Sequence, residues 1–271
     1  MLKTRIKTAA VLTAVLLPLL WFSDVPYLLS IFSACLSLAG TYELYRGAGL
    51  LDKKLFLVLS LVVAGVFPFL NVPLYLGMLS VVFPVILLLF LMAMQRMEEM
   101  PRPSLVMVML LSFMVTVFFA AIPRLRFMEF GMHYLILFML VCVATDTGAY
   151  FVGRAKGRSP LAATVSPKKT IEGALGGIVA ALLVCVLFSI WVDVSDIRVN
   201  YAAVMLYGCV TSIVGQIGDL SMSVIKRLDG VKDFGHLLPG HGGILDRFDS
   251  QMFAAPFTLI FVSEICPLFV W

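Results

Sequence analysis

A polar, glycine-rich run over residues 223–249, SVIKRLDGVKDFGHLLPGHGGILDRFD, stands inside an otherwise strongly apolar chain. Its ammonium and guanidinium groups suit the binding of phosphates, and its carboxylates suit the binding of hard metal ions. Its glycines allow backbone N–H groups to approach an anion closely. The run therefore predicts a site that handles phosphates and metal ions.

The spacing of the polar residues indicates how two helices would present them. Asp219, Ser223 and Arg227 follow one another at intervals of four, so they fall near one face of a helix. Asp246 and Asp249 are three residues apart, and a helix over them would place both on one face. Both faces are expected to point into the same site.

Carboxylates are the expected metal ligands, because Mg²⁺ usually takes one or two of them together with substrate phosphates and water. We expect Asp219 and Asp246 to form the best pair, with Asp146 and Asp249 as further candidates. Among the glycines, His241 is a candidate phosphate donor or general acid. Zinc is not expected, because no thiolate or second histidine has suitable spacing.

A second polar cluster surrounds Asp146, in the run ATDTGAY inside a predicted membrane helix. A charge there costs roughly 2.5 to 3.5 kcal/mol, so an intramembrane acid indicates a functional site. The alternative is an acid that Thr145 and Thr147 hydrogen-bond for helix packing.

The third cluster, SPKKTIEG over residues 166–173, places two lysines directly before a predicted helix. Helix N-terminal N–H groups and two ammonium groups favour a polyanion, whereas simple anchoring at an anionic membrane surface is the alternative. We expect catalysis to involve Asp219, Lys226, His241 and Asp246. The predicted substrate-binding residues are Ser166, Lys168, Lys169, Thr170, Ser223, Arg227, Lys232, Gly240, Gly242, Gly243 and Arg247.

The elements that must position these residues are membrane helices. Of the 271 residues 61% are hydrophobic and only 13% are charged, and the mean hydropathy is +1.04. Such a chain has too little polar surface to cover a soluble globule, so we predict an all-α, polytopic integral membrane protein. Nine helices are expected, over residues 8–23, 25–42, 55–70, 73–94, 104–122, 131–152, 171–192, 201–225 and 251–271.

Basic residues set the predicted orientation, since cytoplasmic loops are enriched in lysine and arginine. With nine crossings, all of the 20 basic residues except Arg124, Arg126 and Arg198 fall on one side. The N-terminus is therefore expected in the cytoplasm and the C-terminus outside. The two longest cytoplasmic loops, 153–170 and 226–250, then carry the polar clusters.

Two segments of different character follow from this assignment. Residues 1–125 are predicted to be membrane helices that serve as a scaffold and lipid-facing wall, and residues 126–271 the catalytic membrane region. In the first segment, Glu43 could reach the site, but we expect a solvated carboxylate at the membrane interface. The five cysteines fall in predicted helices without paired spacing, so we expect buried apolar thiols rather than disulfides.

These motifs resemble those of a known family. The run from Ser223 to Asp249 matches the signature S-x-x-K-R-x4-K-D-x-G-x2-L-P-x-H-G-G-I-x-D-R-F-D of the phosphatidate cytidylyltransferases, also called CDP-diglyceride synthases, without departure. The SPKKTIEG run and the Asp146 segment are similar to that family as well. The resemblance is close over about residues 140–250. The earlier helices resemble the family only in their general character.

The resemblance implies an enzyme of the cytoplasmic (inner) membrane that transfers CMP from CTP to phosphatidate, releasing pyrophosphate and giving CDP-diacylglycerol. It further implies Mg²⁺, with K⁺ as a possible second cation, at the positions of Asp219 and Asp246. A funnel open to the cytoplasm and the bilayer, contact with membrane lipids and a homodimer are also implied, and no nucleic-acid partner is expected.

Two other functions remain open on the residues alone. A CTP-dependent polyprenol or lipid kinase would transfer the γ-phosphate to a hydroxyl and release CDP. An ion-coupled transporter would use Asp146 and Asp219 as relays, but it predicts repeated halves and acids near the membrane midplane. Here the acids gather at one end of the predicted helices and no repeat is visible.

Overall fold

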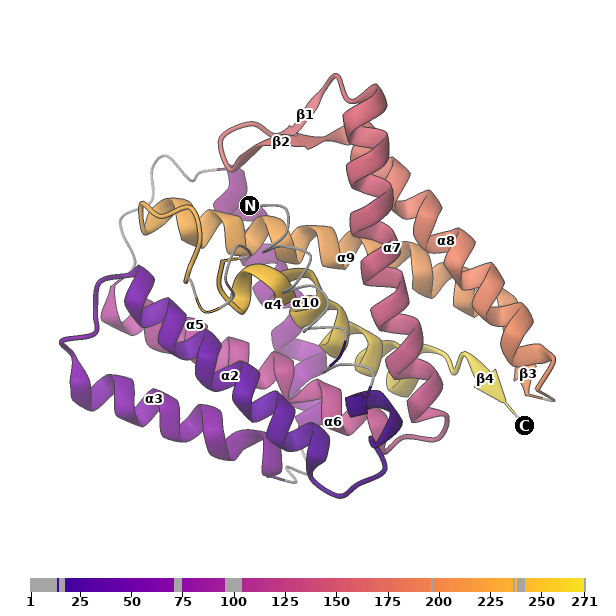
Figure 1. Cartoon of the computed structure of the whole chain (residues 1–271), viewed down its shortest axis with the longest axis horizontal. Coiled ribbons are helices and arrows are strands. Elements are labelled where there is room, and N and C mark those ends of the chain that lie inside the picture. The colour runs from indigo at the N-terminus through magenta and orange to yellow at the C-terminus, as the bar shows by residue number, and fades with distance from the viewer. Residues whose placement is uncertain are drawn as a thin grey trace.

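The computed structural model describes residues 14, 18–70, 75–95, 104–195, 197–235, 237 and 242–270, and it is mostly helical (Figure 1). The predicted helical class is therefore confirmed. Most of the predicted first helix, 8–23, lies outside the described residues. The helices are α2 (Leu28–Gly47), α3 (Lys54–Val66), α4 (Tyr75–Gln95), α5 (Leu105–Phe119), α6 (Ala121–Arg126), α7 (Gly131–Lys156), α8 (Ile171–Asp193), α9 (Tyr201–Leu228) and α10 (Leu245–Ile260), with short turns η1 (Phe67–Phe69) and η3 (Phe261–Ile265).

Within the described residues, five helical stretches are long and apolar enough to cross a membrane. They are Leu28–Gly47, Leu105–Arg126, Gly131–Lys156, Ile171–Asp193 and Tyr201–Leu228. The predicted helix over 104–122 thus corresponds to α5 and α6 in succession.

One face of α8 shows the character of a lipid-facing surface. Leu175, Val179, Leu183 and Leu187 follow one another at intervals of four, and each side chain is more than half exposed. A continuous exposed apolar stripe is unfavourable in water but suits contact with acyl chains.

The prediction for the last helix is wrong at both ends. The helix α10 begins at Leu245, before the predicted membrane span, and includes Asp246 and Asp249, so the helix expected over these two residues is confirmed. Both aspartates are buried in the interior of the protein. The helical run ends at Ile265, and Phe269–Val270 (β4) pairs antiparallel with Arg198–Val199 (β3). Pro267 cannot continue the helical hydrogen bonds, although the residues after it remain apolar.

A second short β ribbon lies on the other side of the molecule, in a segment that was predicted to be a loop. Within the loop predicted over 153–170, Pro160–Ala162 (β1) pairs antiparallel with Ser166–Thr170 (β2). Figure 1 shows this hairpin beyond the joined ends of α7 and α8, whereas β3 and β4 lie at their opposite ends. The SPKKT part of the third motif is therefore a strand.

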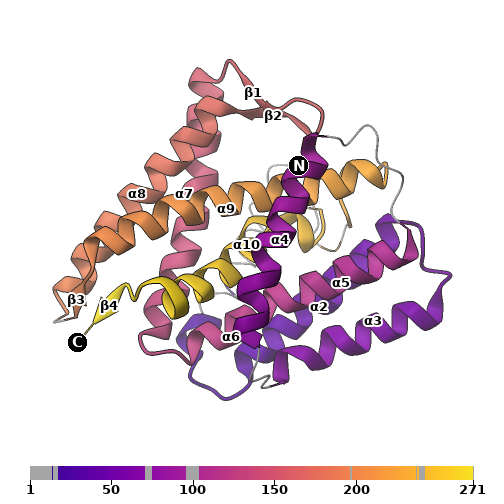
Figure 2. The ribbon, with the colours of Figure 1, turned by 180° about the vertical axis from the view of Figure 1, so that it is seen from behind.

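Glycines allow α7 and α8 to pack closely as an antiparallel pair (Figures 1 and 2). A Cβ atom on Gly148 would lie 2.5 Å from the Cβ of Ala180, and one on Gly176 would lie 2.5 Å from Val152. Small residues at such positions let helix backbones approach within a membrane. The close pairing fixes α7, which carries Asp146, relative to the hairpin.

The helix α10 lies in the centre of the molecule. It packs against α9 and α7 and also against α2, α4, α5 and α6, so it joins the two predicted segments. Seen from behind, α4 crosses the outside of this arrangement, while α2, α3 and α5 lie beside it (Figure 2). Residues on α10 can therefore contact groups from both halves of the chain.

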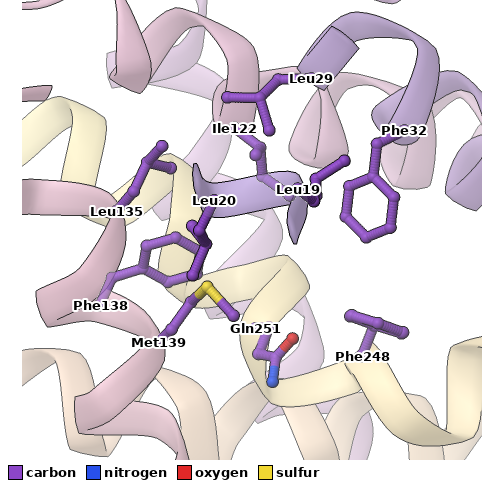
Figure 3. Close-up of a pocket in the computed structure, with 10 residues that line it drawn as sticks. All are labelled: Leu19, Leu20, Leu29, Phe32, Ile122, Leu135, Phe138, Met139, Phe248 and Gln251. Carbon is purple, nitrogen blue, oxygen red and sulfur yellow. The ribbon is translucent and has the colours of Figure 1, made fainter. Parts of the chain in front are cut away.

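A small cavity of about 20 Å³ lies where α2, α6, α7 and α10 meet (Figure 3). Its described lining is apolar apart from Gln251, and it contains none of the predicted site residues. It is a gap in the core that is much too small for a nucleotide. The lining residues are Leu19, Leu20, Leu29, Phe32, Ile122, Leu135, Phe138, Met139, Phe248 and Gln251.

Candidate active site

Three aspartates from three helices come close enough for their charges to interact. Asp219 of α9 interacts electrostatically with both Asp146 of α7 and Asp249 of α10. Asp146 is exposed, Asp219 is partly buried and Asp249 is 9% exposed, so the cluster runs from the surface into the interior. Like charges repel one another in a low dielectric, so such a cluster requires cations to balance it.

Lys169 supplies one of these balancing charges from the hairpin. Its Nζ forms an ion pair with Asp219 Oδ2, and its charge also acts on Asp146 and Asp249. Both partners of the ion pair are about 30% exposed, at 30% for Lys169 and 28% for Asp219. The structure thus brings the SPKKTIEG motif to the aspartates, as the sequence analysis expected.

A buried valine holds the hairpin against α9. Val165 is fully buried and belongs to a small apolar cluster with Leu220, Val224 and Leu228. Its carbonyl accepts a hydrogen bond of 3.2 Å from Arg227 Nε. The side chain of Arg227 therefore supports the loop that carries Lys169.

Side chains also hydrogen-bond backbone N–H groups where β2 joins α8. Thr170 is the N-cap of α8, and its Oγ1 accepts a hydrogen bond of 3.1 Å from the N–H of Gly173. Glu172 Oε2 accepts from the N–H groups of Arg158 and Ser159, at 3.0 and 3.3 Å. These contacts order the hairpin base, and they use Thr170 as a structural cap.

Asp246 is held quite differently from Asp219. Its Oδ1 accepts a hydrogen bond of 2.9 Å from Lys226 Nζ, and its Oδ2 accepts from the N–H groups of Phe234 and Gly243, at 3.0 and 2.8 Å. The Asp246 side chain is 2% exposed and that of Lys226 is 11% exposed. A carboxylate has about four acceptor positions, so three of them are already used.

The other predicted residues occupy several environments. Ser223 is buried on α9 between Asp219 and Arg227, as the spacing predicted. Lys168, Lys232 and Arg247 are exposed, and Ser166 is partly buried. The charge of Arg247 reaches Asp146.

Two predicted residues, Gly240 and His241, lie outside the described residues. Gly242 has φ +86°, a conformation that favours glycine, and a Cβ there would also lie 2.9 Å from Asp246 Oδ2. The glycines of this run were predicted to let backbone N–H groups approach an anion. In the structure the glycine also makes room for a carboxylate of the protein itself.

Sequence reasoning missed a role for Glu43. Its side chain is only 1% exposed rather than solvated, because α2 extends to Gly47 and carries it beneath α10. Its Oε1 and Oε2 accept hydrogen bonds of 2.8 and 2.9 Å from the N–H groups of Ile244 and Leu245. The signal in the sequence was a carboxylate directly after the predicted helix 25–42.

The donor set fits a hard cation that arrives with its substrate. Among the described side chains, no three acidic, histidine or cysteine residues are grouped as a complete metal site. Mg²⁺ does not need one, since it is commonly bound by one or two carboxylates together with phosphate oxygens and water. Asp219 with Asp249 or Asp146 offers such a pair, and a cation there would relieve the repulsion within the cluster.

Fold and site together define a helical membrane protein with an acidic polar centre balanced by lysines. The Cytidylyltransferase family matches the chain over residues 3–265, and the chain belongs to this family.

Several relatives that match this chain carry a more specific name than the family. Proteins named phosphatidate cytidylyltransferase match from Staphylococcus haemolyticus strain JCSC1435 (46% identity over 135 residues, 50% of this chain and 51% of the relative) and Bacillus subtilis strain 168 (45% over 129 residues, 48% and 47%). A third, from Staphylococcus aureus strain COL, is 43% identical over 134 residues, or 49% and 50% of the two chains. The matched region spans about half the length of these relatives.

Proposed function

We propose that this protein is a phosphatidate cytidylyltransferase, which transfers CMP from CTP to phosphatidate and gives CDP-diacylglycerol and pyrophosphate. The observation that carries the proposal is the meeting of Asp146, Asp219 and Asp249 with Lys169 among membrane helices. Membership of the Cytidylyltransferase family and the names of the relatives support it.

The reaction requires no activation of the nucleophile. A phosphate oxygen of phosphatidate forms a bond to the α-phosphorus of CTP, and the bond from that phosphorus to the bridging oxygen breaks. Pyrophosphate leaves with the electron pair. Because both reactants are polyanions, the protein must mainly bring them together and neutralise their repulsion.

The ion pair between Lys169 and Asp219 suggests how the site changes when substrate binds. An incoming triphosphate offers Lys169 a more highly charged partner, so the ammonium group exchanges the carboxylate for phosphate oxygens. Asp219 then becomes available to a cation. Lys168, Lys232 and Arg247 are exposed and would extend the contacts to the phosphates and the departing pyrophosphate.

Asp219, with Asp249 or Asp146, would hold Mg²⁺, and K⁺ is proposed as a second cation. The bound ion would supply Lewis-acid stabilisation of the phosphates and a template for their alignment. Asp246 can join the ligands through its remaining acceptor position or by releasing Lys226. Ser166, Ser223, Gly240 and Gly242 remain predicted substrate contacts, and His241 remains a predicted acid. The N–H of Gly243, also predicted as a substrate contact, is taken by Asp246 Oδ2.

The proposed arrangement in the membrane follows from the chemistry of the substrates. Withdrawing acyl chains from lipid costs ~0.8 kcal/mol per CH₂, so the headgroup must be met at the interface while CTP arrives from water. We propose nine spans in the cytoplasmic (inner) membrane, with the N-terminus and the site facing the cytoplasm and the C-terminus outside. A homodimer is proposed as the assembled form.

The test uses purified protein, phosphatidate, Mg²⁺ and CTP labelled at the α-phosphate. The proposal expects label in the lipid product and release of unlabelled pyrophosphate. Label that never enters the lipid would disprove it. In a parallel reaction with γ-labelled CTP, transfer to an added polyprenol would instead identify a lipid kinase.

A further inference from the structure

Glu43 links the first half of the chain to the helix that carries two of the site's aspartates. It lies on α2, about two hundred residues before its partners in sequence, and its two oxygens accept from two successive backbone N–H groups of Ile244 and Leu245. The side chain is almost completely buried. Asp246 and Asp249 follow within the next five residues of the same helix.

Two glycines make room for this carboxylate. A Cβ atom on Gly235 would lie 2.6 Å from Glu43 Oε1, and one on Gly243 would lie 2.5 Å from both Glu43 oxygens. At each of these glycines the three nearest atoms all belong to Glu43. Gly235 and Gly243 therefore both leave room for the side chain of Glu43.

The contact also shows which groups accept hydrogen bonds from the backbone N–H groups at the start of α10. The N–H groups at a helix N-terminus favour an anion, and here Glu43 takes those of Ile244 and Leu245 while Asp246 takes that of Gly243. A substrate phosphate would have to displace a buried carboxylate to use them. These three amides therefore serve the geometry of the protein, and substrate phosphates depend on the cationic side chains.

We infer that Glu43 is a positioning residue of the active site, which fixes the start of α10 and with it Asp246 and Asp249. This inference rests on the proposed function for its catalytic consequence, although the contact itself does not. Glu43 touches no reacting atom; it acts by restricting where the first turn of α10 can lie. A shift of about 1 Å in catalytic groups is enough to cost a hundredfold in rate.

Hydrogen–deuterium exchange tests the contact without requiring turnover. In Glu43→Gln, which keeps the shape of the side chain but replaces one oxygen by a donor, the amides of Ile244 and Leu245 should exchange about ten- to a hundredfold faster. Peptides from α8 should be unchanged. Unchanged exchange at both amides would overturn the inference, whether or not the protein is a cytidylyltransferase.

Kinetics test the consequence. We expect Glu43→Gln to lower kcat between about ten- and a hundredfold, with a change in the KM for CTP of less than about threefold. The matched control is Glu264→Gln, an exposed glutamate at the far end of the same helical run, which should retain wild-type rates. Wild-type kcat in Glu43→Gln would overturn the positioning role, whereas an inactive wild-type protein would overturn only the proposed function.

A double substitution separates positioning from general stability. Gly235→Ala alone should lower kcat, because its methyl group displaces the Glu43 carboxylate. In a Glu43→Ala background the three atoms nearest to that methyl group are absent, so adding it should change kcat by less than about twofold. Equal losses from Gly235→Ala in both backgrounds would contradict the inference. If Glu43→Ala fails to fold, Glu43→Asp, which is too short to reach both amides, provides the second background.

Discussion

Asp219 and Asp246 carry the same side chain but are held in different ways. Among the described residues, Asp219 forms an ion pair with the partly exposed Lys169, and its charge interacts with those of two other aspartates. Asp246 is buried and accepts from Lys226 and two backbone N–H groups. The two residues should therefore respond differently to substitution, although the sequence analysis assigned them the same role.

Asp219→Asn should abolish catalysis with little effect on stability. The substitution removes a charge that the cation requires, so turnover should fall by about a hundredfold or more. The ion pair that it breaks is partly exposed and is worth about 0–1 kcal/mol. Turnover and thermal unfolding in detergent would be measured together. A variant with wild-type turnover would remove Asp219 from the metal site.

Asp246→Asn should lose stability as well as activity. It leaves the largely buried ammonium group of Lys226 without its partner, and breaking such a pair costs about 3 kcal/mol. The unfolding temperature should fall clearly below that of Asp219→Asn in the same detergent. If the two variants unfold at the same temperature, the hydrogen bonds of Asp246 do not hold the loop as described.

At the level of elements, the β1–β2 hairpin depends on one apolar anchor. Val165 lies between β1 and β2 and packs against α9. This contact brings Lys169 to Asp219. Val165→Ala removes about 1.6 kcal/mol of buried apolar contact and should raise the KM for CTP more than it lowers kcat. Val179→Ala, on the exposed face of α8, is the control and should leave both constants unchanged. An unchanged KM in Val165→Ala would show that the anchor is not needed.

The close pairing of α7 and α8 gives a second prediction at this level. In Gly148→Ala the added methyl group would meet Ala180 Cβ at 2.5 Å and Gly176 O at 2.7 Å, and neither can move without its helix. The unfolding temperature should fall, and Asp146 should shift with α7. Gly65→Ala, within α3, has no contact closer than 3.7 Å and should not lower the unfolding temperature, because alanine favours a helix more than glycine does. Equal stability of the two variants would contradict the described packing.

The sequence predicted the features that follow from spacing within a helix and from the side of the membrane on which a motif lies. The alignment of Asp219 and Ser223 on one face of α9 and the meeting of the SPKKTIEG motif with the aspartates both agree with the structure. Glu43 could not be assigned, because its role depends on a contact two hundred residues away. The helix expected over Asp246 and Asp249 is confirmed, but the membrane span predicted from residue 251 begins too late. Hydropathy alone cannot show that the two aspartates of the first turn of α10 face protein instead of lipid.

For the whole molecule, the distribution of basic residues predicts which side faces the cytoplasm. The hairpin end of α7 and α8 should lie inside and the β3–β4 end outside. In a variant whose five native cysteines are replaced, Val194→Cys at the β3–β4 end should react with a membrane-impermeant maleimide on intact cells. Lys156→Cys should react only after the membrane is opened. The reverse pattern would invert the proposed topology.

The hydrogen bonds of Asp246 have one more consequence. The N–H groups of Phe234 and Gly243 donate to the same oxygen, so the chain between these residues leaves and returns at a single point. A single carboxylate on α10 therefore fixes two backbone positions that lie nine residues apart in the sequence. Loss of that carboxylate would release both positions at once, so one substitution on α10 would disturb the glycine-rich part of the motif as well as the helix that carries it.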